Sequence, residues 1–249
     1  VNTVGAKGLF AWDDPVHGGT VGLQTGDVAL AELLTADLVV TTGLDHREST
    51  SLGAAVGARA ASDPDGVVDV HPAHLALAAG GWPPAAGPGA RPPIYDRLAA
   101  VAGPLYQQPG SPPAAAAALA AGLAPGGLVV AAPGRVGFWV GRTFPTAVAG
   151  SVVVATGDPE GTAEAVALAA ARSGRATTLV APASDPAGAG AVAAVAAEEG
   201  LPLVVEVWAG PDEPALDGPA HRTVPVDWSV LDRLVEVAGP PDPAIWPGH

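Results

Sequence analysis

Two histidines lie in the first two polar loops of the sequence, where their side chains could transfer protons. His17 stands in the segment DDPVHGG and His46 in the segment LDHRES. Imidazole gains and loses a proton near neutral pH, so the two could act as an acid–base pair if their loops meet. The alternative is that each is a solvated loop residue. The sequence contains no Gly-x-Ser-x-Gly elbow, no Gly-x-x-x-x-Gly-Lys-Ser/Thr loop and no His-Glu-x-x-His helix that would indicate other chemistry.

A second pair of histidines has the spacing of metal ligands. His71 and His74 are three residues apart, which would place both on one face of a helix. No third ligand follows at a matching interval in the sequence. We therefore interpret the pair as surface residues, with metal binding as the minor alternative.

Short helices and strands must position these loops. The apolar run over residues 38–42 indicates a parallel strand that is buried on both faces and ends at Gly43. Residues 27–36 predict a short helix with Asp27 as its N-cap. Loops at the carboxyl ends of such strands are where α/β sheets bind ligands. The helix residues expected to face the sheet are Val28, Ala31 and Leu34.

A series of short motifs runs through the first 49 residues. Thr-x-x-x-Lys-Gly is followed by Asp-x-Pro, Gly-x-x-Gly, the predicted helix and Ala-Asp-Leu-Val-Val. The residues that carry the first three motifs are Thr3, Lys7, Gly8, Asp13, Pro15, Gly19 and Gly22. In this order the motifs resemble the central domain of thiamine-diphosphate-dependent 2-oxo-acid enzymes, the family that includes acetolactate synthase and benzoylformate decarboxylase.

The resemblance implies a cofactor site after the first predicted strand. In flavin-containing relatives a Gly-x-Arg-like segment approaches the cofactor at this place, which makes Gly43 and Arg47 candidate contacts. The alternative for this segment is a solvated loop between a strand and a helix.

Other candidate contacts follow from the same resemblance. Gly19 and Gly22 belong to an intact glycine loop, and a predicted strand over residues 66–70 contains Asp69 and leads to His71. In FAD- or nucleotide-binding relatives the acidic end of that strand lies near the adenosine. The glycines could instead serve only close packing of the backbone.

The middle and second half of the sequence predict further elements. A surface segment rich in Pro and Gly covers residues 80–93, and a helix over 94–102 is expected to stop at Gly103-Pro104. Strands and helices then alternate, which indicates βαβ units and a parallel sheet. We expect strands at 127–132, 151–155, 175–181 and 203–208, and helices at 114–123, 161–172, 187–199 and around Leu231, Leu234 and Val235.

Three tryptophans stand in the last quarter of the chain. We expect them to bury the terminal helix rather than to stack on a ligand. The segment 239–249 is expected to be extended, with Trp246 docking it onto the body or onto a partner chain. The three residues are Trp208, Trp228 and Trp246.

The resemblance continues at residues 128–142, which look like the opening of the domain that holds the cofactor diphosphate. In the family an Asp in Gly-Asp-Gly at a strand end and a later Asn hold the magnesium ion, a hard cation that takes oxygen ligands. Here the strand runs into Ala181-Pro182-Ala183, and the chain has no Asn after Asn2. Asp185 could substitute for the missing carboxylate.

A nearby Gly-Asp pair offers a further alternative for the diphosphate. Gly157-Asp158 lies one βα unit too early, and Pro159 stands in place of the second glycine. The turn over 157–162 could bind an anion, although its acidic residues fit a helix cap better. The family's catalytic Glu comes from an N-terminal pyrimidine-binding domain, which would lie in a missing part, come from another chain or have been lost. Because the sequence opens at Val1 and contains no Met, we expect a fragment or processed chain.

Composition narrows the classes of partner. The net charge is −14, and 11 Lys and Arg residues form no basic stripe, which argues against nucleic acid. No apolar run reaches the length of a membrane span, and no secretion signal is visible, so we expect a cytoplasmic protein without a membrane partner. The absence of Cys removes disulfides and thiolate chemistry.

Together these patterns predict an α/β protein with two Rossmann-like or flavodoxin-like parallel sheets and helices on both faces. The resemblance divides it into a truncated central FAD- or NAD-binding-like domain (1–106), a linker (107–113) and a degenerate thiamine-diphosphate-binding-like domain (114–249). It also implies a homo-oligomer, or a partner chain with the pyrimidine-binding domain.

Three functional hypotheses follow. The first is a remnant, subunit or interaction module without a complete cofactor site. The second is an active carboligase or decarboxylase of 2-oxo acids that uses thiamine diphosphate with magnesium and is completed by a missing domain or partner chain. The third is that the first domain alone binds FAD or another nucleotide.

Overall fold

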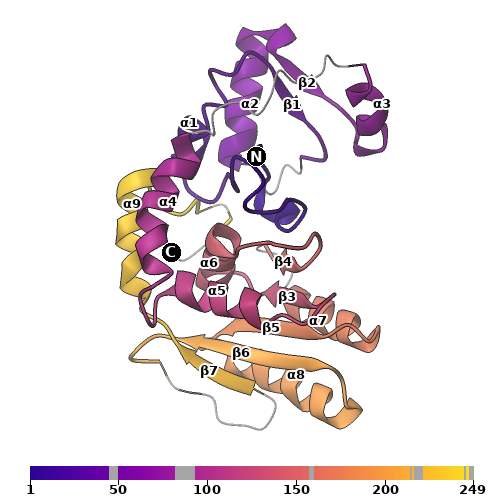
Figure 1. The fold of residues 1–249 in the computed structure, drawn as a ribbon, viewed down its shortest axis with the longest axis vertical. Coiled ribbons are helices and arrows are strands. Elements are labelled where there is room, and N and C mark those ends of the chain that lie inside the picture. Colours follow the sequence, from indigo (N-terminus) through magenta and orange to yellow (C-terminus); the bar gives the residue numbers. More distant parts are fainter. Residues whose placement is uncertain are drawn as a thin grey trace.

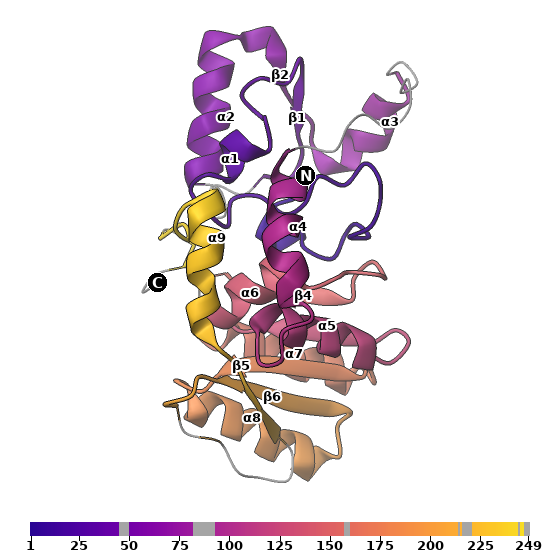
Figure 2. The same cartoon turned by 60° about the vertical axis from the view of Figure 1, so that its left-hand side comes forward.

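The computed structural model describes residues 1–44, 50–81, 93–156, 160–213, 215, 221–243 and 245–246. Figure 1 shows an elongated molecule with a five-stranded sheet and its helices at one end and a two-stranded sheet at the other. Helices α4 (Pro93–Leu105) and α9 (Leu231–Ala238) lie side by side between the two ends, as the turned view in Figure 2 also shows. A helix from the middle of the sequence and one near its end therefore join the two parts.

The larger sheet is wholly parallel and has the strand order β4-β3-β5-β6-β7. The second strand in sequence, β4, therefore lies at the edge of the sheet beside the first, β3, and the third, β5, lies on the other side of β3. This is the strand order of flavodoxin-like folds. The predicted fold class is confirmed. The strands are β3 (Leu128–Ala131), β4 (Val152–Val154), β5 (Thr177–Pro182), β6 (Leu203–Ala209) and β7 (His221–Pro225).

Successive side chains of each strand point to opposite faces of this sheet. Both faces are apolar, and helices cover each of them. Val129 and Ala131 of β3 belong to one apolar cluster, and Leu128 and Val130 belong to another on the opposite face. The first cluster packs against α5 (Pro112–Gly122) and α6 (Arg135–Thr143), and the second against α7 (Thr162–Arg172) and α8 (Pro186–Glu199).

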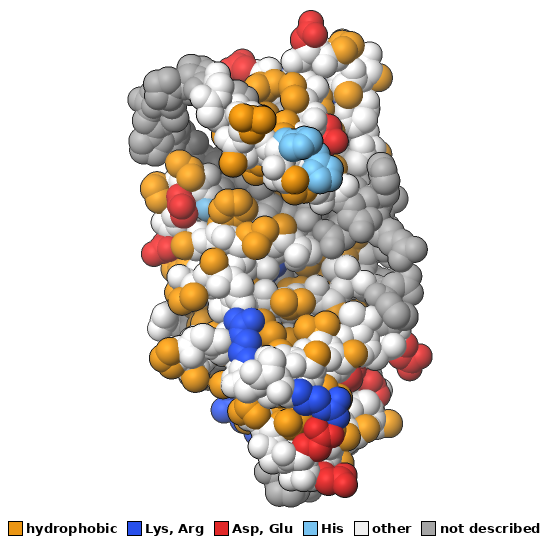
Figure 3. Space-filling model, turned by 90° about the vertical axis from the view of Figure 1, so that its right-hand side faces the viewer, with side chains coloured by type: hydrophobic (Ala, Val, Ile, Leu, Met, Phe, Trp, Pro, Cys, Tyr) orange, Lys and Arg blue, Asp and Glu red, His pale blue; other side chains and the backbone are white. Residues whose placement is uncertain are grey.

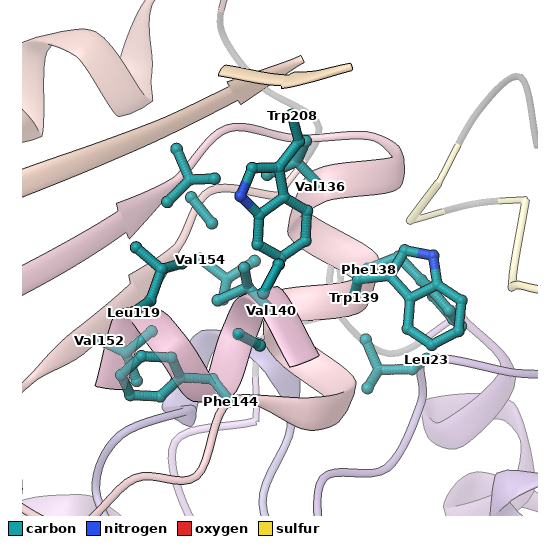
Figure 4. Packing of buried hydrophobic residues seen from close by; sticks show 14 of the residues in the cluster. Leu23, Leu119, Val136, Phe138, Trp139, Val140, Phe144, Val152, Val154 and Trp208 are labelled. Carbon is teal, nitrogen blue, oxygen red and sulfur yellow. The ribbon is translucent and has the colours of Figure 1, made fainter. Parts of the chain in front are cut away.

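The cluster around α6 combines aliphatic side chains with several large aromatic ones, as Figure 4 shows. Phe138 and Trp139 are buried, and the ring of Trp246 meets Phe138 edge to face at a centroid distance of 6.1 Å. Gly137 makes room for this tail residue, since an added Cβ would lie 2.9 Å from the Trp246 ring. The prediction that Trp246 docks the C-terminal segment onto the body is confirmed.

The smaller sheet consists of β1 (Val39–Thr41) and β2 (Val67–Asp69), which are parallel and pair Val39 with Val67. Both strands were predicted, but the expectation that residues 38–42 are buried on both faces is wrong. Leu38 is exposed, and only Val39 of β1 is fully buried. A two-stranded sheet has too little cover to bury a whole strand. Helices α2 (Thr50–Ser62) and α3 (Leu75–Ala79) lie at this end.

The first predicted helix is shorter than expected. Helix α1 spans Asp27–Leu30, Gly26 is its N-cap, and Leu34 is exposed. Val28 and Ala31 are buried as predicted. Asp27 does not cap the helix because its carboxylate is engaged elsewhere, as described below.

Two boundaries near the predicted linker also differ. Helix α4 continues through Gly103-Pro104 to Leu105, since a proline in the last turn removes only one terminal hydrogen bond. Helix α5 begins at Pro112 because Ser111 caps it, accepting a hydrogen bond from the Ala114 N–H at 3.2 Å. Among the described helices, none is long and apolar enough to cross a membrane.

Candidate functional site

A cavity of about 270 Å³ lies where the N-terminal loop meets α4 and the end of α6. It is lined by Leu98 and Ala102 of α4 and by Tyr106 just after the end of that helix, and the three recur at four-residue spacing. The small side chain of Ala102 leaves space in this wall. The Tyr106 hydroxyl donates to the Thr143 carbonyl at 2.5 Å and so ties α4 to the end of α6.

Lys7 lines this cavity and is the only lysine in the sequence. It is 8% exposed, and within the described chain its ammonium has neither a hydrogen bond nor an ion pair. Burial, and then the charge of Arg142, lowers the pKa of Lys7 from 10.5 to about 8. The cavity therefore presents a weakened base that is available to an anion or an electrophile.

His17 lines the same cavity and is buried, so its interpretation as a solvated loop residue is wrong. Its Nε2 lies 2.7 Å from the Oδ1 of Asn2, whose amide nitrogen donates to the Thr3 carbonyl at 2.7 Å. This assignment makes Nε2 the donor and leaves the lone pair on Nδ1. Burial, and then the charge of Lys7, lowers the pKa of His17 and keeps the ring neutral near pH 7. His46, its predicted partner, lies outside the described residues.

The loop that carries Lys7 and His17 is held against the larger sheet. Gly8 has φ +98°, and a Cβ there would lie 2.7 Å from the Val152 carbonyl of β4, so only glycine permits this approach. The Gly8 carbonyl accepts a hydrogen bond from the Gly150 N–H at 2.8 Å, and the Trp12 N–H donates to the Thr146 carbonyl at 2.8 Å. These contacts fix the loop and thereby position Lys7.

Several apolar side chains of the same loop are exposed. Figure 3 shows hydrophobic side chains spread over both halves of one face, with most of its Lys and Arg side chains over the five-stranded end. The exposed apolar side chains of the loop are Leu9, Phe10, Trp12 and Val16.

A buried ion pair joins α6 to Asp27, the first residue of α1. Arg142 donates to both carboxylate oxygens of Asp27, at 2.8 and 2.9 Å, and to the Thr20 carbonyl at 3.0 Å. Asp27 also accepts from the Leu23 and Gln24 amides at 2.9 and 3.1 Å. This carboxylate is therefore satisfied by Arg142 and is not available to Lys7.

Gly19, a predicted cofactor contact, lines the cavity together with its neighbour Gly18. Gly18 and Gly19 donate no backbone hydrogen bond within the described structure. Gly19 has φ +96°, and a Cβ there would meet nothing within 4 Å, so its backbone borders open space. Free amides at such a turn are suited to an anion. Gly22, also in a left-handed conformation, is buried but is not part of the cavity wall.

The remaining predicted contacts lie at the two-stranded sheet. Gly43 has φ +61° after β1, and Asp69 at the end of β2 accepts from the Thr41 hydroxyl at 2.7 Å. Neither lines the Lys7 cavity, and Arg47 lies outside the described residues.

The predicted metal pair lies near this sheet. His71 and His74 are exposed, with ring centroids 5.6 Å apart, and His71 accepts from the Ala73 N–H at 3.2 Å. In the described ranges no group of three His, Asp or Glu side chains could hold a metal ion.

The carboxyl end of β5 does not fit a magnesium–diphosphate group. Ala181 and Ala183 are buried there and offer no side-chain oxygen. Asp185, the predicted substitute, caps α8 by accepting from the Gly188 N–H at 3.0 Å. The other candidate, Asp158, lies outside the described residues. The sequence matches no protein-family model and no curated protein.

Sequence reasoning treated Lys7 only as a motif member and missed its position in the cavity. The available signal was its rarity, since one lysine stands in a chain with 25 acidic residues. The cavity walls come from helices about 90 and 135 residues further along the chain. The residues around Lys7 in the sequence therefore could not indicate that it is buried.

Proposed function

We propose that this chain is a binding module of the thiamine-diphosphate enzyme family it resembles, and that it holds a small organic anion in the Lys7 cavity. The observation that carries the proposal is a buried cation without a carboxylate partner. A buried charge is costly unless it is paired, and Arg142 finds Asp27 in the same region. Lys7 has no such partner in the described chain, and a bound anion would supply one.

The walls narrow the class of ligand. Leu98, Phe144 and Leu234 give the cavity apolar surfaces, and the amides of Gly18 and Gly19 add donors beside the single ammonium. Its volume of about 270 Å³ is at the small end of ligand sites. These features support a carboxylate on a short apolar body, and the family resemblance favours a 2-oxo acid.

The alternative function is carboligation or decarboxylation with thiamine diphosphate and magnesium. It requires a partner chain or missing domain for the catalytic Glu, and oxygen ligands that the described end of β5 does not supply. The module proposal requires neither. FAD or nucleotide binding by the first domain would also involve Gly43 and Asp69, which do not line the cavity, besides the glycine loop with Gly19 and Gly22.

Thermal unfolding separates these functions. Pyruvate and 2-oxoisovalerate, each at about 100 times its dissociation constant, should stabilise the chain by about 2.7 kcal/mol, which corresponds to a melting shift of roughly 5 to 10 °C. The shift should vanish in Lys7→Met and persist in Arg97→Met, which removes an exposed charge from α4.

Two results would contradict the module proposal. One is the absence of any shift with 2-oxo acids, and the other is an unchanged shift in Lys7→Met. A shift with magnesium and thiamine diphosphate would favour the enzyme. A shift with FAD or NAD alone would move the function to the nucleotide site that the resemblance implies.

A further inference from the structure

We propose that Lys7 forms an imine with the carbonyl group of a 2-oxo acid, so that the cavity captures its ligand covalently. The inference rests on the proposed function, because it concerns the same cavity and the same class of ligand. It adds that the amine acts as a nucleophile as well as a charge. The geometric basis is an unpartnered amine in an apolar cavity that also contains the free amides of Gly18 and Gly19.

The state of the amine supports this chemistry. Only a neutral amine attacks a carbonyl carbon, and an ordinary lysine is almost wholly protonated near pH 7. With a pKa of about 8, Lys7 is neutral in about one molecule in ten at pH 7, roughly 300 times the fraction of an ordinary lysine. The surroundings that lower the pKa also restrict access of bulk water, which hydrolyses imines.

The other groups in the wall suit a 2-oxo acid. Its carboxylate can accept hydrogen bonds from the amides of Gly18 and Gly19, and the backbone of Gly19 borders open space. Its apolar end can lie against Leu98 and Phe144 on the walls formed by α4 and the end of α6. This arrangement leaves the carbonyl group, next to the carboxylate, for Lys7.

The reaction is balanced without another reactant. The nitrogen lone pair of Lys7 forms a bond to the carbonyl carbon, and the π electrons move to the oxygen, which takes one amine proton. The nitrogen lone pair then forms the C=N bond and expels the hydroxyl group, which takes the second amine proton and leaves as water. The carbonyl oxygen and both amine protons are thus released together as water.

The sequence makes this proposal easy to test, because Lys7 is the only lysine. The chain is incubated with pyruvate and sodium borohydride, which reduces an imine to a stable secondary amine, and peptides are then analysed by mass spectrometry. We expect one adduct, on the peptide that contains Lys7. Lys7→Arg keeps the charge but cannot form the imine, so it should give no adduct, and Lys7→Met serves as a second negative variant.

Lactate, which has a hydroxyl group in place of the carbonyl, separates this inference from the proposed function. Both acids should bind, and only pyruvate should be trapped. Equal melting shifts with lactate and pyruvate but no adduct would overturn the imine and leave anion binding intact. If neither acid shifts the melting temperature and pyruvate is not trapped, both proposals are overturned. An adduct confined to the N-terminal amine, or retained in Lys7→Arg, would also overturn the imine.

Discussion

The burial of Lys7 predicts that replacing it will stabilise the protein. The folded pKa of about 8 lies below the unfolded value of 10.5, so the unfolded chain binds more protons between these two pH values. The free energy of unfolding should therefore rise with pH through this window. Below pH 8 the buried ammonium should lower it by the full amount. The difference of 2.5 units corresponds to about 3 kcal/mol at pH 7.

Lys7→Met removes this charge while keeping an unbranched side chain of similar length. We expect the variant to be more stable by about 3 kcal/mol at pH 7, by about 2 at pH 9 and by less than about 0.5 near pH 10.5. At pH 7 the melting temperature should rise by roughly 6 to 12 °C for a chain of this size. Urea unfolding at the three pH values measures the difference directly.

Arg97→Met is the matched control, since it also removes one positive charge, but from the exposed face of α4. It should change stability by less than about 0.5 kcal/mol at every pH. The reasoning would be refuted if Lys7→Met were less stable than the parent chain at pH 7. A stability difference that stays constant from pH 7 to 10.5 would refute it equally, because the cost would then not arise from a titrating charge.

Two further predictions concern the groups that hold the cavity in place. Asp27→Asn should destabilise the chain by about 3 kcal/mol in urea unfolding, because it leaves the buried Arg142 without its carboxylate. Arg172→Gln breaks an exposed bidentate ion pair and should leave the urea unfolding midpoint nearly unchanged. An equal loss of stability in Asp27→Asn and Arg172→Gln would contradict the argument from burial. Gly8→Ala should cost about 2 kcal/mol or more and weaken ligand binding, because its Cβ would meet the β4 backbone. Gly126→Ala has a positive φ but open space, so a loss as large as at Gly8 would show that backbone conformation alone matters.

Strands β3, β4, β5 and β6 of the five-stranded sheet were predictable because their signals are local, whereas β7 (His221–Pro225) was not predicted. The valine-rich runs at β3 and β4 alternate with alanine-rich helices, and this order by itself predicts a parallel sheet. Helix α6 was missed as a helix, since Gly137 and Gly141 lower its intrinsic helix propensity. Both glycines serve close packing, Gly137 against Trp246 and Gly141 against Leu23, and such contacts are not visible in the local sequence.

The candidate site was predictable only in part. Gly19 was identified from its loop, and its positive φ and position in the cavity are consistent with a binding role. The partner of Asp27 is Arg142, 115 residues away, so the carboxylate resembled a helix cap in the sequence. The burial of Lys7 and His17 likewise depends on α4 and α6, and no local pattern encodes it.

The most direct test of the central claim is the pKa of Lys7 itself. Because the chain has one lysine, labelling with lysine carrying ¹³C at the ε carbon gives a single side-chain resonance to follow between pH 6 and 12. We predict a midpoint near pH 8, moving upward when a 2-oxo acid analogue such as lactate binds beside the ammonium. A midpoint near 10.5 that no anion changes would show a solvated lysine and would contradict the account of the cavity.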